Sequence, residues 1–342
     1  MFQADERTYV STGHLPPAAD VSRLIERVYS RYAANSDGEC SQVYPALARV
    51  PRDLFGLCMA GTDGQMHAAG AVDHLFTIMS VSKPFVFALV CQQIGPDEAR
   101  LRLGVNATGF AFNSVVPLEI SPDGRTNPMV NPGAIAATSL ISGDTYDAKW
   151  QTIVSGLSAF AGRDLSINEE VLASARATNL RNRGLAHLLH SAGRIYCDPI
   201  DALDLYTRQC SLDVTARDLA VMGATLADGG VNPITGQRVV DPMTCHYTLA
   251  VMATAGLYET SGDWLYEIGL PGKSGIGGGI VTVSPGKGGL GTFAPLLDGA
   301  GNSIKGQLAA RDLSQELGID LFLSKPQADA EDASQPVREA SR

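Results

Sequence analysis

Hydrophobic and polar positions in the first part of the chain predict a helix followed by a β-hairpin. Between residues 21 and 32 the apolar side chains recur at the spacing of one helix face. Two short apolar runs follow, at 54–59 and 68–72, with the sequence Gly-Thr-Asp-Gly at 61–64 between them. Turn-forming residues between two apolar runs are typical of paired antiparallel strands. We therefore expect these two runs to form neighbouring strands of one sheet.

The central part of the chain is predicted to be mainly helical. Residues 81–94 form a long apolar segment that ends at Gly95, which indicates a buried helix. Residues 133–225 carry Ala-rich and Leu-rich faces at helical spacing. After residue 229, glycine and β-branched residues become frequent. The elements predicted there are two strands and a helix, at 280–283, 290–293 and 306–317.

This order of strands, helices and strands favours an α+β fold over an alternating α/β fold. We expect one discontinuous sheet domain, formed by residues 19–79 and 226–324, with a mainly helical domain at 80–225 inserted into it. Residues 1–18 are predicted to form a flexible arm. The Ala-, Asp-, Glu- and Ser-rich residues 325–342 are predicted to form a disordered tail.

Composition narrows the classes of function. The 342 residues carry 26 basic and 36 acidic side chains, a net charge of −10, so the chain lacks the basic surface that nucleic-acid binding needs. It has no signal-peptide pattern and no apolar run of membrane-spanning length. Its six cysteines are scattered, without the spacing of a zinc site. We expect a cytoplasmic protein that binds neither nucleic acid nor a membrane.

Ser80 and Lys83 form an S-x-x-K motif at the predicted start of the helix at 81–94. Residues three apart lie on one helix face, so a neutral lysine there can accept the proton of the serine hydroxyl. This arrangement is typical of serine acyl-transfer enzymes. The alternative is that Ser80 only caps the helix. A second match, from Ser284 to Lys287, contains Pro-Gly and cannot open a helix.

A second motif, Lys273-Ser274-Gly275, precedes the glycine-rich strand. It matches the end of a phosphate-binding loop, but Glu267 stands where that loop requires glycine. It also matches the K-[ST]-G strand that faces the S-x-x-K helix in serine acyl enzymes. Taken alone, the motif is more typical of a turn before a strand. Together with Ser80, it favours an acyl-transfer site, and only six lysines occur in the whole chain.

Seven segments, in order, resemble the serine-dependent glutaminase family, whose members share the β-lactamase/DD-peptidase-like fold. The likeness extends from about residue 40 to residue 323. The segments are FTIMSVSKPF, NPMVNPGAI, RNRGLA, LYTRQCSLDVT, ATLADGGVNPITGQRV, GLYETSG and LPGKSGIGGGI. The resemblance implies an antiparallel sheet flanked by helices, a mainly helical domain, and an active site between them.

The resemblance also implies roles for four catalytic residues. Ser80 matches the nucleophile that forms the acyl-enzyme, and Lys83 matches its base. Tyr258, in GLYETSG, matches the tyrosine that relays a proton to the leaving ammonia. Lys273 is the expected partner of Lys83 in setting the electrostatic field of the site.

Four further residues match positions that bind the substrate. Asn131 and Asn182 match amides that hold polar groups of the substrate. Tyr206 matches a tyrosine that lines the pocket. Ile276 matches the residue whose backbone N–H forms the oxyanion hole together with that of Ser80.

The chain departs from the family pattern at four positions. Ala175 stands where the family has a glutamate that binds the α-ammonium group of the substrate, and Val43 stands where it has a tyrosine. Met79 replaces a glutamine before the nucleophile, and Pro132 replaces an alanine after Asn131. The positions matched to catalysis are retained, whereas positions that recognise a free amino acid have changed.

The resemblance therefore implies an amidohydrolase that converts glutamine, or a glutamine-like small-molecule amide, to the acid and ammonia. One alternative is a relative with a larger or N-modified amide or ester substrate, acting as an amidase, transacylase or cyclase. Another is a non-catalytic binding protein. No metal or organic cofactor is expected, and the resemblance implies a homo-oligomer, either a dimer or a tetramer.

Overall fold

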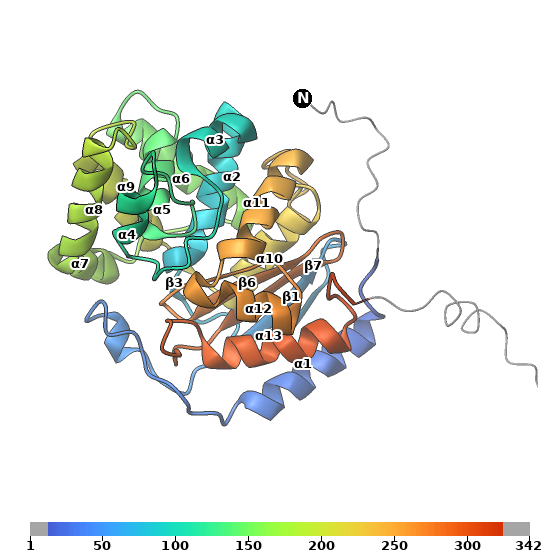
Figure 1. The fold of residues 1–342 in the computed structure, drawn as a ribbon. Coiled ribbons are helices and arrows are strands. Elements are labelled where there is room, and N and C mark those ends of the chain that lie inside the picture. The colour runs from blue at the N-terminus through green and yellow to red at the C-terminus, as the bar shows by residue number, and fades with distance from the viewer. Residues whose placement is uncertain (1–12, 324–342) are drawn as a thin grey trace, which may run out of the picture.

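The computed structural model describes residues 13–323 and has a five-stranded antiparallel sheet at its centre (Figure 1). The strand order is β2-β1-β7-β6-β5, and a separate short pair is formed by β3 and β4. The strands are β1 (Gly56–Gly61), β2 (Met66–Gly70), β3 (Phe76–Thr77), β4 (Asp213–Val214), β5 (Gly272–Ser274), β6 (Gly279–Ser284) and β7 (Gly288–Phe293). The first and last parts of the chain therefore build one sheet, since β1 pairs with β7.

Helices cover both faces of this sheet. The helices α1 (Ala18–Tyr32) and α13 (Ile304–Glu316) lie side by side along one face (Figure 1), and α10 (Ala216–Ala227) packs on the other. Leu57 and Met59 of β1 belong to the hydrophobic cluster on the α1 side. Cys58 and Ala60 belong to the cluster that contains residues of α10. This division follows from the strand geometry, because successive side chains point to opposite faces.

Glycines in β7 permit α10 to approach the sheet closely. A Cβ atom at Gly291 would lie 2.0 Å from the carbonyl oxygen of Ala216, and one at Gly289 would lie 2.3 Å from the nitrogen of Ala224. Neither distance is tolerated between non-bonded atoms. The glycine-rich sequence of β7 is thus required for the packing of this helix.

The remaining helices form a second group around α2 (Ser82–Ile94), whose residues 82–91 are all buried. A helix that is apolar on all sides is typical of a core position. The helices α5 (Asn131–Leu140), α6 (Tyr146–Ala161) and α11 (Pro242–Ala255) contact it. The other helices are α3 (Pro96–Leu103), α4 (Val116–Ile120), α7 (Glu169–Thr178), α8 (Leu180–Ser191), α9 (Pro199–Cys210) and α12 (Ser261–Ile268).

The elements predicted from the sequence are confirmed with small shifts at their ends. The helix predicted at 81–94 is α2, and Gly95 ends it with φ of 84°. The predicted hairpin is β1 and β2, and the predicted late strands are β6 and β7. The first and last helices each begin a few residues earlier than predicted. The α+β class, with an antiparallel sheet flanked by helices, is confirmed.

The domain boundaries stay a prediction. Within the segment predicted as the helical domain, α10 packs on the sheet rather than on α2. Residues 1–12 of the predicted arm and the predicted tail at 325–342 lie outside the described residues. Residues 18–32, by contrast, form a helix whose apolar side is buried.

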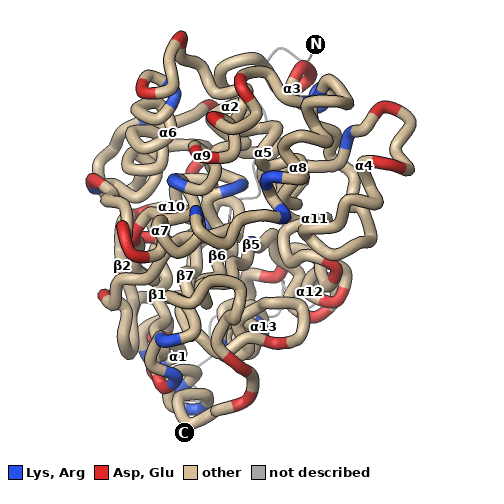
Figure 2. The backbone as a smooth tube through the Cα atoms, turned by 90° about the vertical axis from the view of Figure 1, so that its left-hand side faces the viewer, with Lys and Arg blue, Asp and Glu red and all other residues tan. Residues whose placement is uncertain are grey.

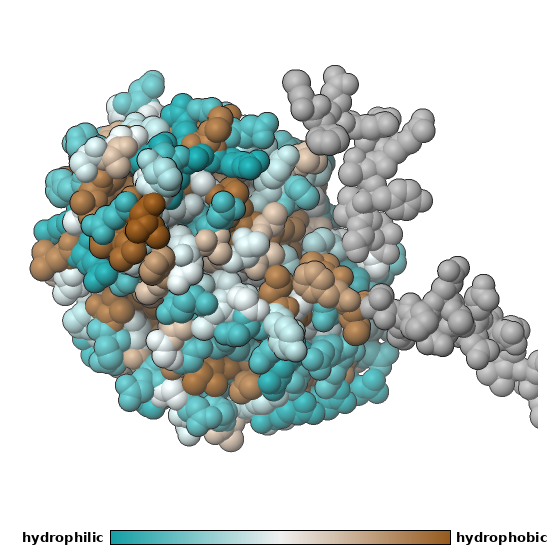
Figure 3. All heavy atoms as spheres, in the orientation of Figure 1, coloured by the Kyte–Doolittle hydropathy of each residue, from teal (hydrophilic) through white to brown (hydrophobic). Residues whose placement is uncertain are grey.

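None of the helices within residues 13–323 is both long enough and apolar enough to cross a bilayer. Asp and Glu are distributed over the molecule, with examples near α3, α4 and α12 (Figure 2). On the face shown in Figure 3, small hydrophobic patches are surrounded by hydrophilic residues.

Candidate active site

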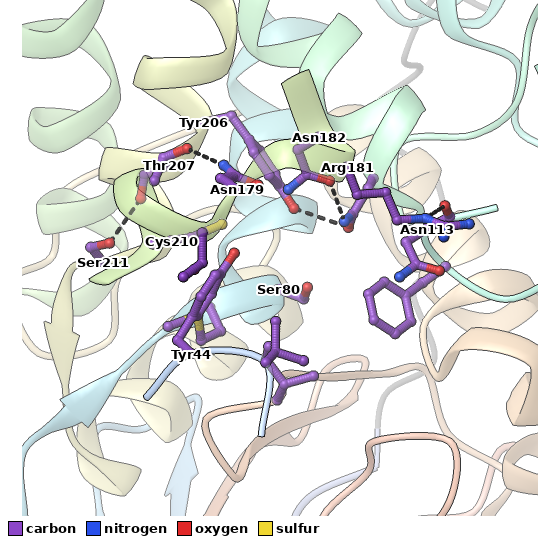
Figure 4. A pocket seen from close by; sticks show the side chains of 17 residues that line it. Tyr44, Ser80, Asn113, Asn179, Arg181, Asn182, Tyr206, Thr207, Cys210 and Ser211 are labelled. Atoms are coloured by element: carbon purple, nitrogen blue, oxygen red, sulfur yellow. Dashed lines mark hydrogen bonds between the residues drawn. The ribbon is translucent and has the colours of Figure 1, made fainter. Parts of the chain in front are cut away.

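A cavity opens between the helical group and the loop that follows β5 (Figure 4). About 830 Å³ of space inside it is free of protein atoms, and part of this space is open to solvent. Its lining comes from the turn before α2, from α5, α7, α8 and α9, and from loops at 43–44, 112–113 and 276. The site is therefore assembled from distant parts of the chain.

Ser80 lies on the floor of this cavity, in the 3₁₀ turn η2 (Met79–Val81) that leads directly into α2. The preceding residue, Met79, has φ of 47°, in the left-handed region that side chains other than glycine rarely adopt. Such strain is typical of functional sites, where surrounding structure holds it in place. The positive end of α2 lies next to Ser80, which favours negative charge on its hydroxyl oxygen.

Lys83 lies one turn further along and is completely buried. Its Nζ donates hydrogen bonds to Oδ1 of Asn131, at 2.8 Å, and to the carbonyl oxygen of Met129, at 3.3 Å. Among residues 13–323, no carboxylate forms an ion pair with it. Burial lowers the pKa of Lys83 to about 7. A neutral amine is thus available near neutral pH, as a general base requires.

A chain of side-chain hydrogen bonds connects Lys83 to the cavity wall. Oδ1 of Asn131 also accepts a hydrogen bond from the Tyr206 hydroxyl at 3.1 Å. Nδ2 of Asn131 donates to Oδ1 of Asn182 at 3.1 Å. Within residues 13–323, Nδ2 of Asn182 has no hydrogen-bond acceptor, and the side chain borders the cavity (Figure 4). This amide is therefore placed to donate to a bound molecule.

Lys273 and Tyr258 form a second buried pair beside Ser80. Nζ of Lys273 donates to the carbonyl oxygens of Gly256, at 2.7 Å, and Ser274, at 2.6 Å. It also lies 4.3 Å from the centre of the Tyr258 ring. Burial, followed by the charge of Lys83, lowers the pKa of Lys273 well below its usual value.

The Tyr258 hydroxyl is protonated at neutral pH and lies near the nucleophile. Burial raises the pKa of Tyr258 to about 12, and hydrogen bonding with Ser80 and Ser274 opposes that rise. Its hydroxyl donates to the carbonyl oxygen of Ser274 at 3.3 Å. Like Met79, Tyr258 is a non-glycine residue with positive φ, at 57°. Backbone strain thus occurs both next to the nucleophile, at Met79, and at the tyrosine whose hydroxyl lies near it.

Two backbone N–H groups have the properties of an oxyanion hole. Within residues 13–323, neither the N–H of Ser80 nor that of Ile276 donates a hydrogen bond to the protein. The backbone at Gly275 approaches so closely that a Cβ atom there would lie 3.2 Å from the nitrogen of Ser80. Glycine at this position therefore permits the backbone before Ile276 to approach the turn that carries Ser80.

Comparison with known proteins identifies the family. The model of the Glutaminase family matches residues 38–322, most of the chain. The chain belongs to the glutaminase family. It is 69% identical to "Glutaminase 2" of Yersinia pestis over 318 residues, which cover 93% of this chain and 94% of that protein. It is 50% identical to a "Glutaminase" of Brucella canis over 305 residues, 89% of this chain and 96% of the relative.

Solved glutaminase structures have the same fold. "Probable glutaminase ybaS" aligns with 90% of this chain and all of its own, with a TM-score of 0.89 and 41% identity. "Mglu in its glutamate form" aligns with 89% of this chain and 70% of its own, with a TM-score of 0.84 and 36% identity. The predicted β-lactamase-like fold and the predicted class, a glutaminase-type amidohydrolase, are both confirmed.

The structure of this glutaminase brings all eight predicted site residues together. Five of them border the cavity, namely Ser80, Asn131, Asn182, Tyr206 and Ile276. The other three, Lys83, Tyr258 and Lys273, are buried behind the lining and reach it through the contacts described above. Their individual roles are taken up in the proposed mechanism.

Three of the four altered positions border the cavity, namely Val43, Met79 and Ala175. The lining also contains residues that the sequence patterns did not reveal, such as Tyr44. Phe112 packs against Tyr258, with 4.7 Å between ring centres and 40° between the ring planes. Arg181 precedes the predicted Asn182, but its position could not be derived from the motif.

Proposed function

We propose that this glutaminase hydrolyses the side-chain amide of glutamine to the acid and ammonia through an acyl-enzyme on Ser80. The observation that carries the proposal is that a serine bordering the cavity is followed, one helical turn later, by a buried lysine. Because burial lowers the pKa of Lys83 to about 7, the neutral amine of this lysine can act as the base. The family assignment supports the same chemistry.

Acylation begins when Lys83 takes the proton of the Ser80 hydroxyl. The serine oxygen then attacks the amide carbon of the substrate and forms a tetrahedral intermediate. The N–H groups of Ser80 and Ile276 donate hydrogen bonds to the negatively charged oxygen of that intermediate. Such hydrogen bonds stabilise the charge most strongly in a site that contains little water. Because neither N–H group has another acceptor within residues 13–323, no hydrogen bond to that part of the chain has to be broken first.

Collapse of the intermediate requires a proton on the leaving nitrogen. The Tyr258 hydroxyl supplies it, and protonated Lys83 returns a proton to the phenolate, so that ammonia leaves and Lys83 is neutral again. Deacylation repeats these steps with water as the attacking group. Lys83 removes a proton from water, and the Ser80 oxygen regains a proton when the acid is released.

Lys273 acts as a positioning residue in this scheme. Its amine and the Tyr258 hydroxyl both donate to the carbonyl oxygen of Ser274. Lys273 therefore fixes the plane of the Tyr258 ring and the backbone that leads to Ile276. Asn131 positions Lys83, and Asn182 and Tyr206 hold polar groups of the substrate. Each step of this scheme uses groups of the chain itself, so we predict that the reaction needs no metal or organic cofactor.

Intact-mass measurement of enzyme mixed with excess glutamine and quenched in acid tests the nucleophile. We expect a glutamyl adduct on the native chain and none on Ser80→Ala, which should also lose ammonia release. Ser284→Ala is the matched control, because Ser284 begins the other S-x-x-K match. Ser284 is the last residue of β6, and its hydroxyl donates a hydrogen bond to the carbonyl oxygen of Ile319. The Ser284→Ala variant should keep both properties. An adduct on Ser80→Ala, or its retained turnover, would show that another residue is the nucleophile.

We also propose a cytoplasmic homo-oligomer. All six cysteines are free thiols in the structure, as expected in a reducing compartment. Leu180, Leu188 and Ile200 on α8 and α9 are exposed, and hydrophobic patches lie over the region of α7–α9 (Figure 3). Light scattering after size exclusion should give a dimer or tetramer, and Leu188→Glu should lower its mass. A monomeric native chain would contradict the proposal.

A further inference from the structure

The cavity has an unusual charge distribution for an enzyme that binds an amino acid. Among the described residues that border it, none is Asp or Glu, and the single charged side chain is Arg181. Nε of Arg181 donates to the carbonyl oxygen of Asn113 at 2.8 Å, and the two side chains lie together at the cavity (Figure 4). Within residues 13–323 its two terminal nitrogens form neither a hydrogen bond nor an ion pair. They are available to a carboxylate of the ligand.

Acidic residues close to the lining in sequence are bound elsewhere. The carboxylate of Asp204, on α9, accepts hydrogen bonds from Arg176 and Tyr146. That of Asp213 accepts from Asn168. Glu259 is exposed and does not border the cavity. No described carboxylate is therefore placed to pair with a cation inside the site.

The charge at the cavity wall disfavours a second positive charge. Arg181, the single charged residue among the described lining residues, is a cation, and the buried amines of Lys83 and Lys273 behind Ser80 offer no negative charge. An α-ammonium group that enters this site loses water and gains no counter-ion, which costs binding free energy. An α-carboxylate, in contrast, finds the Arg181 guanidinium.

Part of the lining is apolar and reaches solvent. Val43, Ala175 and Phe112 contribute apolar side chains, and Val43 is 52% exposed although it borders the cavity. This surface offers contact to an uncharged group attached to the α-nitrogen of a bound glutamine. Its exposure at Val43 leaves room for that group to extend outwards.

We propose that the preferred substrate is glutamine with an acylated α-nitrogen and a free α-carboxylate. The inference rests on the proposed function, because it specifies the substrate of the same Ser80 site. Acylation removes the α-ammonium charge, the carboxylate pairs with Arg181, and the acyl group contacts Val43 and Ala175. Two sources share this chemistry, namely free N-acylglutamine and a peptide that ends in glutamine. In both substrates the side-chain amide is hydrolysed to the acid and ammonia, so the reaction itself is unchanged.

Ammonia release from three substrates tests the proposal directly. N-acetylglutamine should give a kcat/KM about 10-fold or more above that of free glutamine, because no unpaired charge is buried. N-acetylalanylglutamine separates the two sources: a kcat/KM above that of N-acetylglutamine assigns peptides, and a lower value assigns free N-acyl amino acids. A higher kcat/KM for free glutamine than for both acylated forms overturns the inference and leaves the proposed function intact. Failure of all three substrates, with no adduct on Ser80, overturns the proposed function.

Paired substitutions at Ala175 and Val43 locate the specificity. Ala175→Glu places a carboxylate in the cavity and should raise the ratio of kcat/KM for free over acetylated glutamine about 10-fold or more, whereas Ala175→Gln adds the same bulk without charge and should not. Val43→Glu and Val43→Gln repeat the comparison at a half-exposed position that tolerates substitution. If the Glu and Gln variants at both positions fold and give the same ratio of kcat/KM for free over acetylated glutamine, the inference is overturned. Arg181→Gln should raise KM for both substrates and leave their kcat ratio unchanged.

Discussion

Lys83 on α2 donates a 2.8 Å hydrogen bond to Oδ1 of Asn131 on α5, so a neutral amide rather than a carboxylate holds the buried amine. A carboxylate in that place would stabilise the ammonium form. The amide fixes the position of Nζ and provides far less stabilisation of its charge, and burial then lowers the pKa of Lys83 to about 7. This relationship explains how a lysine can serve as the base in a site without histidine among its described lining residues.

The first prediction concerns the pH dependence of activity. Neutral Lys83 is the active form, so kcat/KM should rise as pH increases through about 7 and then level off. Initial rates of ammonia release over this range, in buffers of constant ionic strength, check the prediction. A rate that falls as pH rises through neutrality would exclude neutral Lys83 as the base.

Asn131→Asp should shift this profile to higher pH. A carboxylate next to Nζ favours the ammonium form, and an opposite charge at this distance raises a lysine pKa by about 1–3 units. Asn131→Ala is the control, because it removes the hydrogen bond without adding charge. It should lower activity without an upward shift of the midpoint. Equal midpoints for the two variants would contradict the electrostatic role assigned to residue 131.

Lys83→Met should lower the activity and also weaken the pH dependence of the unfolding free energy. Loss of the base should lower kcat by about 10²–10⁴-fold. The pKa of Lys83 is lower in the folded state than in the unfolded state. At pH values between these two pKa values, the unfolded state therefore binds more protons than the folded state. The unfolding free energy of the native chain should therefore rise from about pH 7 towards the usual lysine pKa, and that rise should be smaller in Lys83→Met. Denaturant unfolding at a series of pH values measures it, and identical slopes would refute the buried-lysine effect.

Tyr258→Phe should lower kcat by about 10²-fold or more while the protein stays folded. The substitution removes the hydroxyl that protonates the leaving group, but it keeps the ring that packs against Phe112 and lies beside Lys273. Tyr266→Phe is the matched control, since Tyr266 is 93% exposed on α12. Steady-state kinetics and thermal melting of both variants check this. A Tyr258→Phe enzyme with native kcat would remove the phenol from the mechanism.

Two glycine substitutions should have opposite effects on stability. Gly291→Ala places a Cβ 2.0 Å from the Ala216 carbonyl oxygen, so it should destabilise the fold by about 1–3 kcal/mol. Gly262→Ala, within α12, meets no atom within 4 Å and should stabilise the fold by about 0.4–1 kcal/mol. Denaturant titration measures both changes. A neutral Gly291→Ala variant would mean that α10 can move away from the sheet without cost.

Much of the fold follows from local sequence patterns. The helix at α2 and the hairpin of β1 and β2 could be predicted, because apolar spacing and turn residues act over a few positions. The pairing of β1 with β7 could not be read from such patterns, since the two strands are more than 200 residues apart. It is decided by which apolar faces the helices cover.

The sequence by itself predicted the Ser80–Lys83 pair, because residues three apart lie on one face once their segment is helical. It also placed Lys273 and Gly275 before a glycine-rich strand. Only the tertiary structure decided that Lys83 is buried against Asn131, that Arg181 borders the cavity, and that no described lining residue is acidic. These properties depend on groups brought together from separate helices and loops, and both desolvation and charge act through space rather than along the chain.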